Sequence, residues 1–273
     1  MFRLECLMPE RNASKGKQAM NSRSSRQIKS KRRVPTVKDA QQMANLLLKA
    51  FPEIDAILLC GSVARGDANE WSDVDLIVTS SEPNLTPQLL QKALSKRKER
   101  ISLIYFPTSV FQKLYDDRAL FIAHLKMEGI ILFDRLEILK RLLTQPFAPS
   151  IDVAEEIRAH RAKLAPYADP RRFNNNFLFC LSHLYSIGKG VVMLGLVKRG
   201  KLEFNREEAF RRFAGLNPDL AKEALKVAQL RPFYSRVTCR QPERLPFSYK
   251  SAGAKMREVV NAIEILAKRA EGL

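Results

Sequence analysis

A Gly-Ser turn and two aspartates stand close together in the chain and could bind a phosphate ester together with a cation. The turn, Gly61 to Asp67, reads GSVARGD, and the triplet Asp73-Val74-Asp75 follows it. A glycine at a strand-to-helix turn lets the backbone approach a ligand, and the first amides of the next helix favour an anion. Two carboxylates nearby suit a divalent cation that bridges to phosphate oxygens. The pattern predicts phosphate-ester chemistry.

Each side chain of this cluster has a use. The Ser62 hydroxyl adds a donor at the turn, and Arg65, about one helical turn later, can supply a positive charge. Asp73 and Asp75 occupy alternate positions at the start of an apolar run, so their side chains share one face of a strand. A solvent-facing strand edge could also carry two aspartates. The apolar residues that follow Asp75 indicate a buried strand instead, where paired carboxylates need a compensating cation.

The elements around the cluster alternate between strands and helices. Apolar runs of strand length occupy residues 54–60, 74–78, 101–106 and 130–133, and amphipathic stretches separate them. A helix is predicted at residues 38–51 with Thr36 as its N-cap, and further helices at 85–98, 109–115 and 118–127. This order predicts an α/β (α+β) domain with a small mixed sheet.

Strand signals are lost after the Pro-rich segment at residues 145–150. Helices are predicted at residues 153–164, 174–197, 206–214, 221–229 and 252–269, which indicates an all-α bundle. We therefore expect three parts: a basic arm at residues 1–33, a catalytic domain at 34–149 and a helical substrate-binding or lid domain at 150–273. Composition predicts the arm to be disordered, since it has few apolar side chains.

The turn and the aspartates together resemble the signature of the DNA polymerase β-type nucleotidyltransferase superfamily, in particular its minimal nucleotidyltransferase members. The motif covers about 15 residues, and the order of elements from about 36 to 134 resembles the catalytic domain of that superfamily. The resemblance implies transfer of a nucleoside monophosphate from an NTP, with Mg²⁺ or Mn²⁺ as cofactor. It implies that Gly61 and Ser62 hold the triphosphate with help from Arg65, and that Asp73 and Asp75 are catalytic metal ligands.

One position departs from the superfamily pattern. A third carboxylate is usual on the strand after the next helix, and this strand carries Ser102 where the acid is expected. In a two-metal mechanism one ion activates the nucleophile and the other stabilises the leaving group. Ser102 predicts a weakened nucleophile-side ion, while Glu99 could substitute only after a shift of register. NTP binding is therefore better supported than turnover.

The distribution of charge points to the acceptor. The net charge of the 273 residues is +18. Nine basic residues and no acidic one lie between Arg11 and Arg33, residues 34–149 are neutral, and residues 150–273 carry +10. Such surfaces attract phosphate-rich ligands, which favours an RNA acceptor such as tRNA. The alternatives are an antibiotic-type small-molecule nucleotidyltransferase and a catalytically impaired nucleotide-binding partner in a two-component system.

Lys189 and the three histidines lie in patterns that are less specific than the turn and the aspartates. Lys189 interrupts an apolar helix and is either a snorkelling lysine or a nucleotide phosphate contact made across the domain cleft. We expect His183 to be a core histidine and His160 to lie on a solvated helix face. The spacing of Arg118 and His124 is assigned to chance. Four dispersed cysteines and the absence of an uncharged apolar run of membrane-spanning length predict a cytoplasmic protein that does not contact a membrane, with an unknown oligomeric state.

Overall fold

The computed structural model describes residues 33–272 with gaps at residues 98, 175 and 239, while residues 1–32 and 273 lie outside the description. The basic arm falls almost entirely in the part that is not described, so its proposed role stays a prediction. Residues 32–273 form one compact unit. The expected boundary near residue 150 therefore also stays a prediction.

A mixed four-stranded sheet lies at the centre of the first half of this unit. Its strands are β1 (Ile54–Cys60), β2 (Val74–Ser80), β3 (Ile101–Pro107) and β4 (Ile130–Asp134), in the order β3-β2-β1-β4. β1 pairs antiparallel with both β2 and β4, whereas β2 and β3 are parallel. All four strands coincide closely with the apolar runs of the sequence, and the predicted mixed sheet is confirmed.

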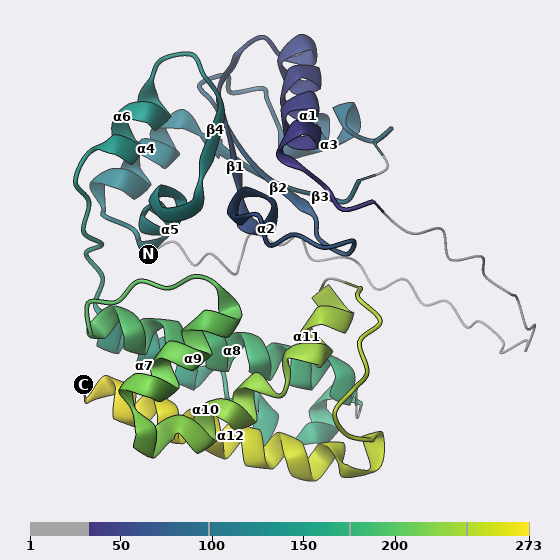
Figure 1. Ribbon diagram of the computed structural model, residues 1–273, viewed down its shortest axis with the longest axis vertical. Helices are drawn as coiled ribbons and strands as arrows, with labels where there is room; N and C mark the ends of the chain where they lie inside the picture. Colours follow the sequence, from purple (N-terminus) through teal and green to yellow (C-terminus); the bar gives the residue numbers. More distant parts are fainter. Residues whose placement is uncertain (1–32, 98, 175, 239, 273) are drawn as a thin grey trace, which may run out of the picture. The chain divides into compact units, whose positions relative to one another are not determined.

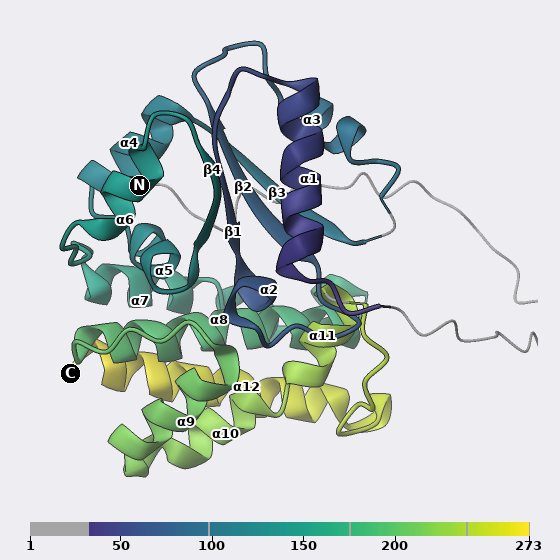
Figure 2. The ribbon, with the colours of Figure 1, turned by 45° about the horizontal axis from the view of Figure 1, so that its top comes forward.

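Helices cover both faces of this sheet (Figures 1 and 2). One face packs against α1 (Val37–Ala50) and α3 (Pro87–Ala93), and the other packs against α4 (Thr108–Asp116), α5 (Leu120–Glu128) and α6 (Ile138–Thr144). Every residue of β1 is buried as a result. Because β1 is buried on both faces, packing fixes the position of its end and therefore of the turn that follows.

The start of α1 follows the sequence prediction. Thr36 is the N-cap, its hydroxyl accepts from the Asp39 amide at 3.3 Å, and the Asp39 carboxylate accepts from the Thr36 amide at 2.8 Å. These reciprocal bonds are a capping box, which satisfies two amides that the helix itself leaves unpaired.

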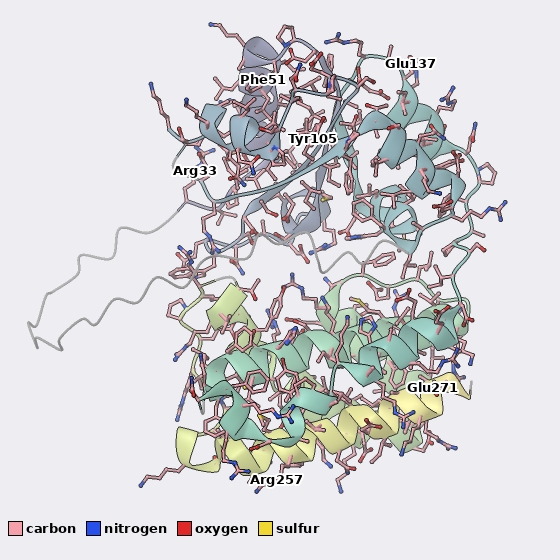
Figure 3. The ribbon with its side chains drawn as sticks, turned by 180° about the vertical axis from the view of Figure 1, so that it is seen from behind. Arg33, Phe51, Tyr105, Glu137, Arg257 and Glu271 are labelled. Carbon is pink, nitrogen blue, oxygen red and sulfur yellow. The ribbon has the colours of Figure 1, made fainter. Side chains whose placement is uncertain are left out.

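The second half is helical, as predicted. It contains α7 (Val153–Ala162), α8 (Phe177–Lys198), α9 (Arg206–Leu216), α10 (Ala221–Ala228), α11 (Arg231–Thr238) and α12 (Tyr249–Glu271), with the 3₁₀ turns η2 (Ala165–Ala168), η3 (Pro170–Phe173) and η4 (Pro218–Leu220). Helix α8 packs against α7, α9, α11 and α12, the last of which carries the labelled Arg257 and Glu271 in Figure 3. Helices α6 and α11, which have seven and eight residues, were not predicted from the sequence.

Helix α8 has the length and composition of a helix that could cross a membrane, and it is the one such helix among the residues that the structure describes. It spans 22 residues, and 56% of its most apolar window is buried within the protein. Its buried residues include Leu181, Leu184 and Val192, which belong to the core of the helical half. We therefore describe α8 as the core helix around which the other helices pack.

Candidate functional site

The Gly-Ser turn forms at the end of β1, as the sequence predicts. Helix α2 (Gly61–Arg65) begins directly after Cys60, and no side chain caps its first amides. Gly61 has a φ of 74°, and a Cβ atom at this position would lie 2.1 Å from Oδ2 of Asp75. Glycine is therefore required here for two reasons: the backbone is left-handed, and a carboxylate occupies the space of a side chain.

Asp75 lies at the centre of the sheet edge. It is opposite Cys60 on one neighbouring strand and opposite Ser102 on the other. Burial raises the pKa of the Asp75 carboxyl and the charge of Asp73 raises it further, while a hydrogen bond from Ser102 and the nearby Arg206 and Arg65 lower it. Asp73 is the residue just before β2, which starts at Val74, so it lies next to the strand and not within it.

The two aspartates fit a hard divalent cation. Their carboxylates are close enough to disfavour ionisation of Asp75, which a bound cation would reverse. Mg²⁺ commonly uses only one or two protein carboxylates and takes further ligands from substrate phosphates and water. Within the described part of the chain no cluster of three or more His, Cys, Asp or Glu side chains could hold a metal.

Arg65 has carboxylate partners that the sequence did not predict. Its guanidinium bonds Asp67, with Nε to Oδ2 at 3.3 Å, and it also pairs with Glu128 at the end of α5. Burial raises the pKa of Glu128 although Arg65 acts in the opposite direction. Glu128 immediately precedes the Gly129-β4 segment, so only the pairing of β4 with β1 brings it beside the turn.

His124 also lies in this region, although in the sequence it was considered only for its spacing from Arg118. Its Nε2 contacts the Glu128 carboxylate, and its ring stacks on Phe204 with centroids 4.5 Å apart. Burial, with help from the positive charges of Arg65 and Lys189, lowers the pKa of His124 to about 4. The imidazole is therefore neutral at pH 7. The Arg118–His124 spacing plays no part in this arrangement.

Lys189 lies on the side of α8 that faces this region. It influences the pKa of His124, and its Nζ lies 5.9 Å from the centre of the Tyr234 ring on α11. Arg206, at the start of α9, lies over the same ring at 4.8 Å and lowers the pKa of Asp75. Two cations from separate helices thus meet at one aromatic ring near the aspartates. The sequence reading found Lys189 but not Arg206.

Two polar links join the helical half to the loops around the site. Asn205, which caps α9, donates from Nδ2 to Asp67 Oδ2 at 3.0 Å. Arg100 bonds the carbonyl of Trp71 at 3.0 Å and that of Thr238 at 3.4 Å. Asp67 is therefore bonded directly to the helical half, and Trp71 is bonded to it through Arg100.

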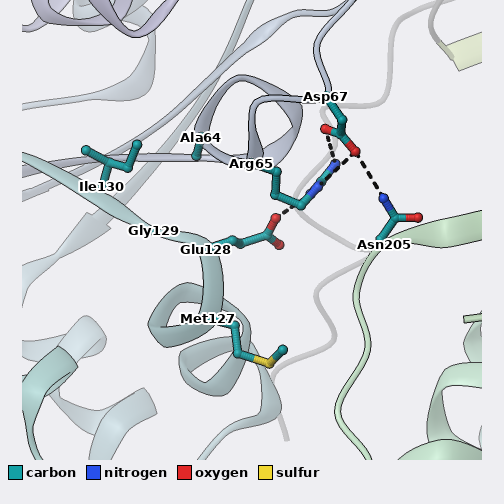
Figure 4. A pocket seen from close by; sticks show the side chains of 8 residues that line it. All are labelled: Ala64, Arg65, Asp67, Met127, Glu128, Gly129, Ile130 and Asn205. Atoms are coloured by element: carbon teal, nitrogen blue, oxygen red, sulfur yellow. Dashed lines mark hydrogen bonds and ion pairs between the residues drawn. The ribbon is translucent and has the colours of Figure 1, made fainter. Parts of the chain in front are cut away.

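A cavity of about 620 Å³ opens beside Arg65 (Figure 4). Its polar lining consists of Arg65, Asp67, Glu128 and Asn205, and its remaining lining residues are Ala64, Met127, Gly129 and Ile130. The dashed bonds in Figure 4 form one chain from Glu128 through Arg65 and Asp67 to Asn205. This volume could admit a small polar molecule next to the turn.

The remaining histidines lie elsewhere. His183 is exposed and contacts the hydroxyl of Tyr167, so the expectation of a core histidine is wrong. His160 packs against Gly190 of α8, and its Nδ1 lies 2.9 Å from the carbonyl oxygen of Glu156. His160 is therefore half-buried between α7 and α8 rather than on a fully solvated face.

Residues 41–137 match the family described as the nucleotidyltransferase domain. The matched segment contains the Gly-Ser turn, both aspartates and all four strands. Residues 41–137 are therefore similar to a nucleotidyltransferase domain, as the motif predicts. A comparison with curated proteins found no match.

Two solved structures are similar to this chain. A spectinomycin adenyltransferase from Enterococcus faecialis, solved with ATP and spectinomycin, is 15% identical with a TM-score of 0.49, and the alignment covers 84% of this chain and 100% of that one. A nucleotidyltransferase-like protein from Exiguobacterium sibiricum is 16% identical with a TM-score of 0.39 and coverages of 84% and 75%. Both similarities are too low to carry an argument about substrate.

Proposed function

We propose that the protein transfers a nucleoside monophosphate from an NTP to a hydroxyl group of RNA. The observation that carries the proposal is the contact between Gly61 and Asp75, which joins a phosphate-binding turn to a pair of carboxylates. Such a pair has a use when a cation and phosphate oxygens lie between the carboxylates and the turn. The match of residues 41–137 to the nucleotidyltransferase domain supports the same reaction class.

The residues around the turn would bind the triphosphate. The first amides of α2 and the Ser62 hydroxyl offer hydrogen bonds to phosphate oxygens. Arg65 has five N–H donors, so its bonds to Asp67 and Glu128 leave donors for a phosphate. Lys189 and Arg206 would contribute positive charge from the helical half, because both act on groups of the nucleotidyltransferase domain.

In the transfer step, the acceptor oxygen bonds to the α-phosphorus, and the bond from that phosphorus to the bridging oxygen breaks. Pyrophosphate leaves, and the hydroxyl proton passes to water. Asp73 and Asp75 would hold Mg²⁺ or Mn²⁺, which would neutralise negative charge on the phosphate oxygens. The chain's own contribution is to orient the phosphates and the acceptor in one place.

RNA is the acceptor that the charge distribution favours. Residues 150–273 carry +10 and nine basic residues lie between Arg11 and Arg33, whereas residues 34–149 are neutral. The basic excess therefore lies outside the nucleotide-binding domain, where an acceptor would bind. We place the reaction in the cytoplasm.

The cavity in Figure 4 favours a second candidate, a small polar acceptor. Its lining includes the carboxylates of Asp67 and Glu128, and Glu203 lies near enough to raise the pKa of Glu128 further. An acidic lining of this kind could accept a hydroxylated cationic molecule, which the positive helical half would otherwise repel. A third candidate, nucleotide binding without transfer, follows from Ser102.

The test is incubation of the protein with each α-labelled NTP, Mg²⁺ or Mn²⁺, and either cellular RNA or a small-molecule extract. We expect label in the RNA fraction, and label in the small-molecule fraction alone would replace RNA with the second candidate. Asp75→Asn should abolish transfer, while Asp116→Asn, an exposed carboxylate on α4, should have wild-type activity. Wild-type activity in Asp75→Asn would refute the site. Binding of NTP without label in either fraction would support the binding-only candidate.

A further inference from the structure

Four aromatic rings form a continuous surface at the start of α8, which we call the α8 aromatic surface. It consists of Tyr167 from η2, Phe173 from η3, and Phe179 and His183 from α8. Tyr167 and Phe173 stack with centroids 4.9 Å apart and planes at 12°, while Phe173 and Phe179 are 6.4 Å apart. Phe179 and His183 are 5.8 Å apart. Tyr167 and His183 are also 5.7 Å apart, so the four rings form a closed group.

Two of the four rings are open to solvent. Tyr167 is buried, whereas Phe179 is 46% exposed and His183 is exposed. The neighbouring Cys180, Leu181 and Leu184 are buried in the helical core, so packing of α8 does not require a large apolar ring at position 179. An exposed aromatic ring beside a further exposed ring offers a flat face on which another ring can stack.

Arginines lie beside the open rings. Arg171 and Arg172 belong to η3 and are exposed, and Arg171 is oriented by Asp169 through bonds of 2.9 and 3.2 Å. Asp169 is the acidic group of this segment, so the charge of these three residues together is +1. Aromatic faces combined with arginine are typical of proteins that bind single-stranded nucleic acid, because bases stack on the rings and phosphates pair with the cations.

The position of the surface connects it to the proposed reaction site. His183 lies six residues before Lys189 on the same helix, and Phe179 lies ten before it. At about 1.5 Å per residue these separations are about 9 and 15 Å along α8. A few stacked nucleotides, at about 3.4 Å each, cover this span. At about 100° per residue, the side chains of Phe179 and His183 point about 80° and 120° around the helix axis from Lys189. A strand whose end lay near Lys189 would therefore turn partly around α8 to place its preceding bases on these rings.

We propose that the α8 aromatic surface binds single-stranded RNA by stacking the bases that precede the acceptor nucleotide. This inference rests on the RNA acceptor in the proposed function and assigns residues to it. The surface recognises unpaired bases of any sequence, since every base has an aromatic face. Specificity for a particular RNA would come from elsewhere in the molecule.

The test compares binding of two labelled oligomers of twelve units to the full chain at fixed salt: oligouridylate and an abasic ribose phosphate oligomer of equal charge. The wild type should bind oligouridylate more tightly. Phe179→Ala should weaken that binding about 5- to 100-fold and leave the abasic oligomer unaffected. Phe179→Tyr, which retains an aromatic ring, should bind like the wild type. Leu225→Ala is the matched control, because Leu225 is 58% exposed on α10.

Equal affinity of the wild type for both oligomers would overturn the inference, as would unchanged oligouridylate binding by Phe179→Ala. Asp75→Asn should bind both oligomers like the wild type although it cannot transfer. Stacking and transfer are therefore separate measurements. Absence of transfer to RNA together with a Phe179-dependent preference for oligouridylate would refute the proposed reaction and support the surface.

Discussion

At Gly61 the backbone has a φ of 74° and lies against the Asp75 carboxylate, whereas Gly66 has a φ of 81° and open space around it. A comparison of substitutions at these two glycines separates the effect of backbone strain from the effect of a disturbed site. Alanine at Gly66 should lower the free energy of unfolding by about 1 kcal/mol, because the backbone there is left-handed, and alanine at Gly61 should lower it further, because its Cβ must also displace the Asp75 carboxylate. Gly61→Ala should also displace Asp75 and reduce transfer about 100-fold, since a displacement of about 1 Å has effects of that size.

Gly66→Ala is the control for this experiment. Chemical denaturation would measure the stability of both variants, and labelled NTP would measure transfer. Equal activity in the two variants would mean that the closeness of Gly61 and Asp75 does not matter for the reaction.

Ser102 is the residue at which the site departs from the pattern of the superfamily that its motif resembles. It lies opposite Asp75 and donates a hydrogen bond to it. Ser102→Asp would place a third carboxylate there, which should lower stability without metal and raise both the Mg²⁺-dependent stabilisation and the transfer rate. Ser102→Asn is the uncharged control. Thermal unfolding with and without Mg²⁺ measures the change in stability. If Mg²⁺ does not stabilise Ser102→Asp more than the wild type, another residue takes the place of the third carboxylate.

At the scale of single elements, α1 offers a pH-dependent test. Burial acts to raise the pKa of Asp39, but hydrogen bonds from Thr36 and the charges of Arg33 and Arg97 overcome it and lower the pKa. A carboxyl with a lowered folded-state pKa stabilises the protein above its unfolded pKa, about 3.9, and loses this effect as the pH falls through the folded value.

Asp39→Asn should therefore lower the free energy of unfolding at pH 7 by about 1 kcal/mol, and the difference from the wild type should shrink below about pH 4. Urea unfolding at several pH values measures it. Asp116→Asn on α4 should show no such dependence, and a constant difference for Asp39→Asn at all pH values would contradict the assignment.

At the scale of the whole molecule, we expect nucleotide binding in the neutral residues 34–149 and RNA binding in the basic parts of the chain. Deletion of residues 1–31 removes seven of the nine basic residues between Arg11 and Arg33 and leaves the compact unit of residues 32–273. RNA affinity should fall and its salt dependence should become shallower, because fewer phosphates are neutralised. ATP affinity should not change. Titrations at several salt concentrations check both, and an unchanged salt slope would mean that the arm does not contact RNA.

The local sequence determined much of this molecule. The four strands, the Thr36 cap and the long helices follow from hydrophobic period and capping, which act over a few neighbouring residues. The Gly-Ser turn and the aspartates also stand within 15 residues of one another, so their use together could be read from the chain. The short helices α6 and α11 were not predicted from the sequence, although α3 and α10, which have the same lengths, were.

The tertiary structure decided which distant side chains join the site. Glu128 reaches Arg65 because β4 pairs with β1, and Arg206 comes near Asp75 because α9 begins beside the Asp67 loop. No local pattern marks these residues, since their proximity results from strand order and helix packing between parts of the chain far apart in sequence. The same reason explains why His183 is exposed: a residue's burial on a long helix depends on which neighbours cover each face.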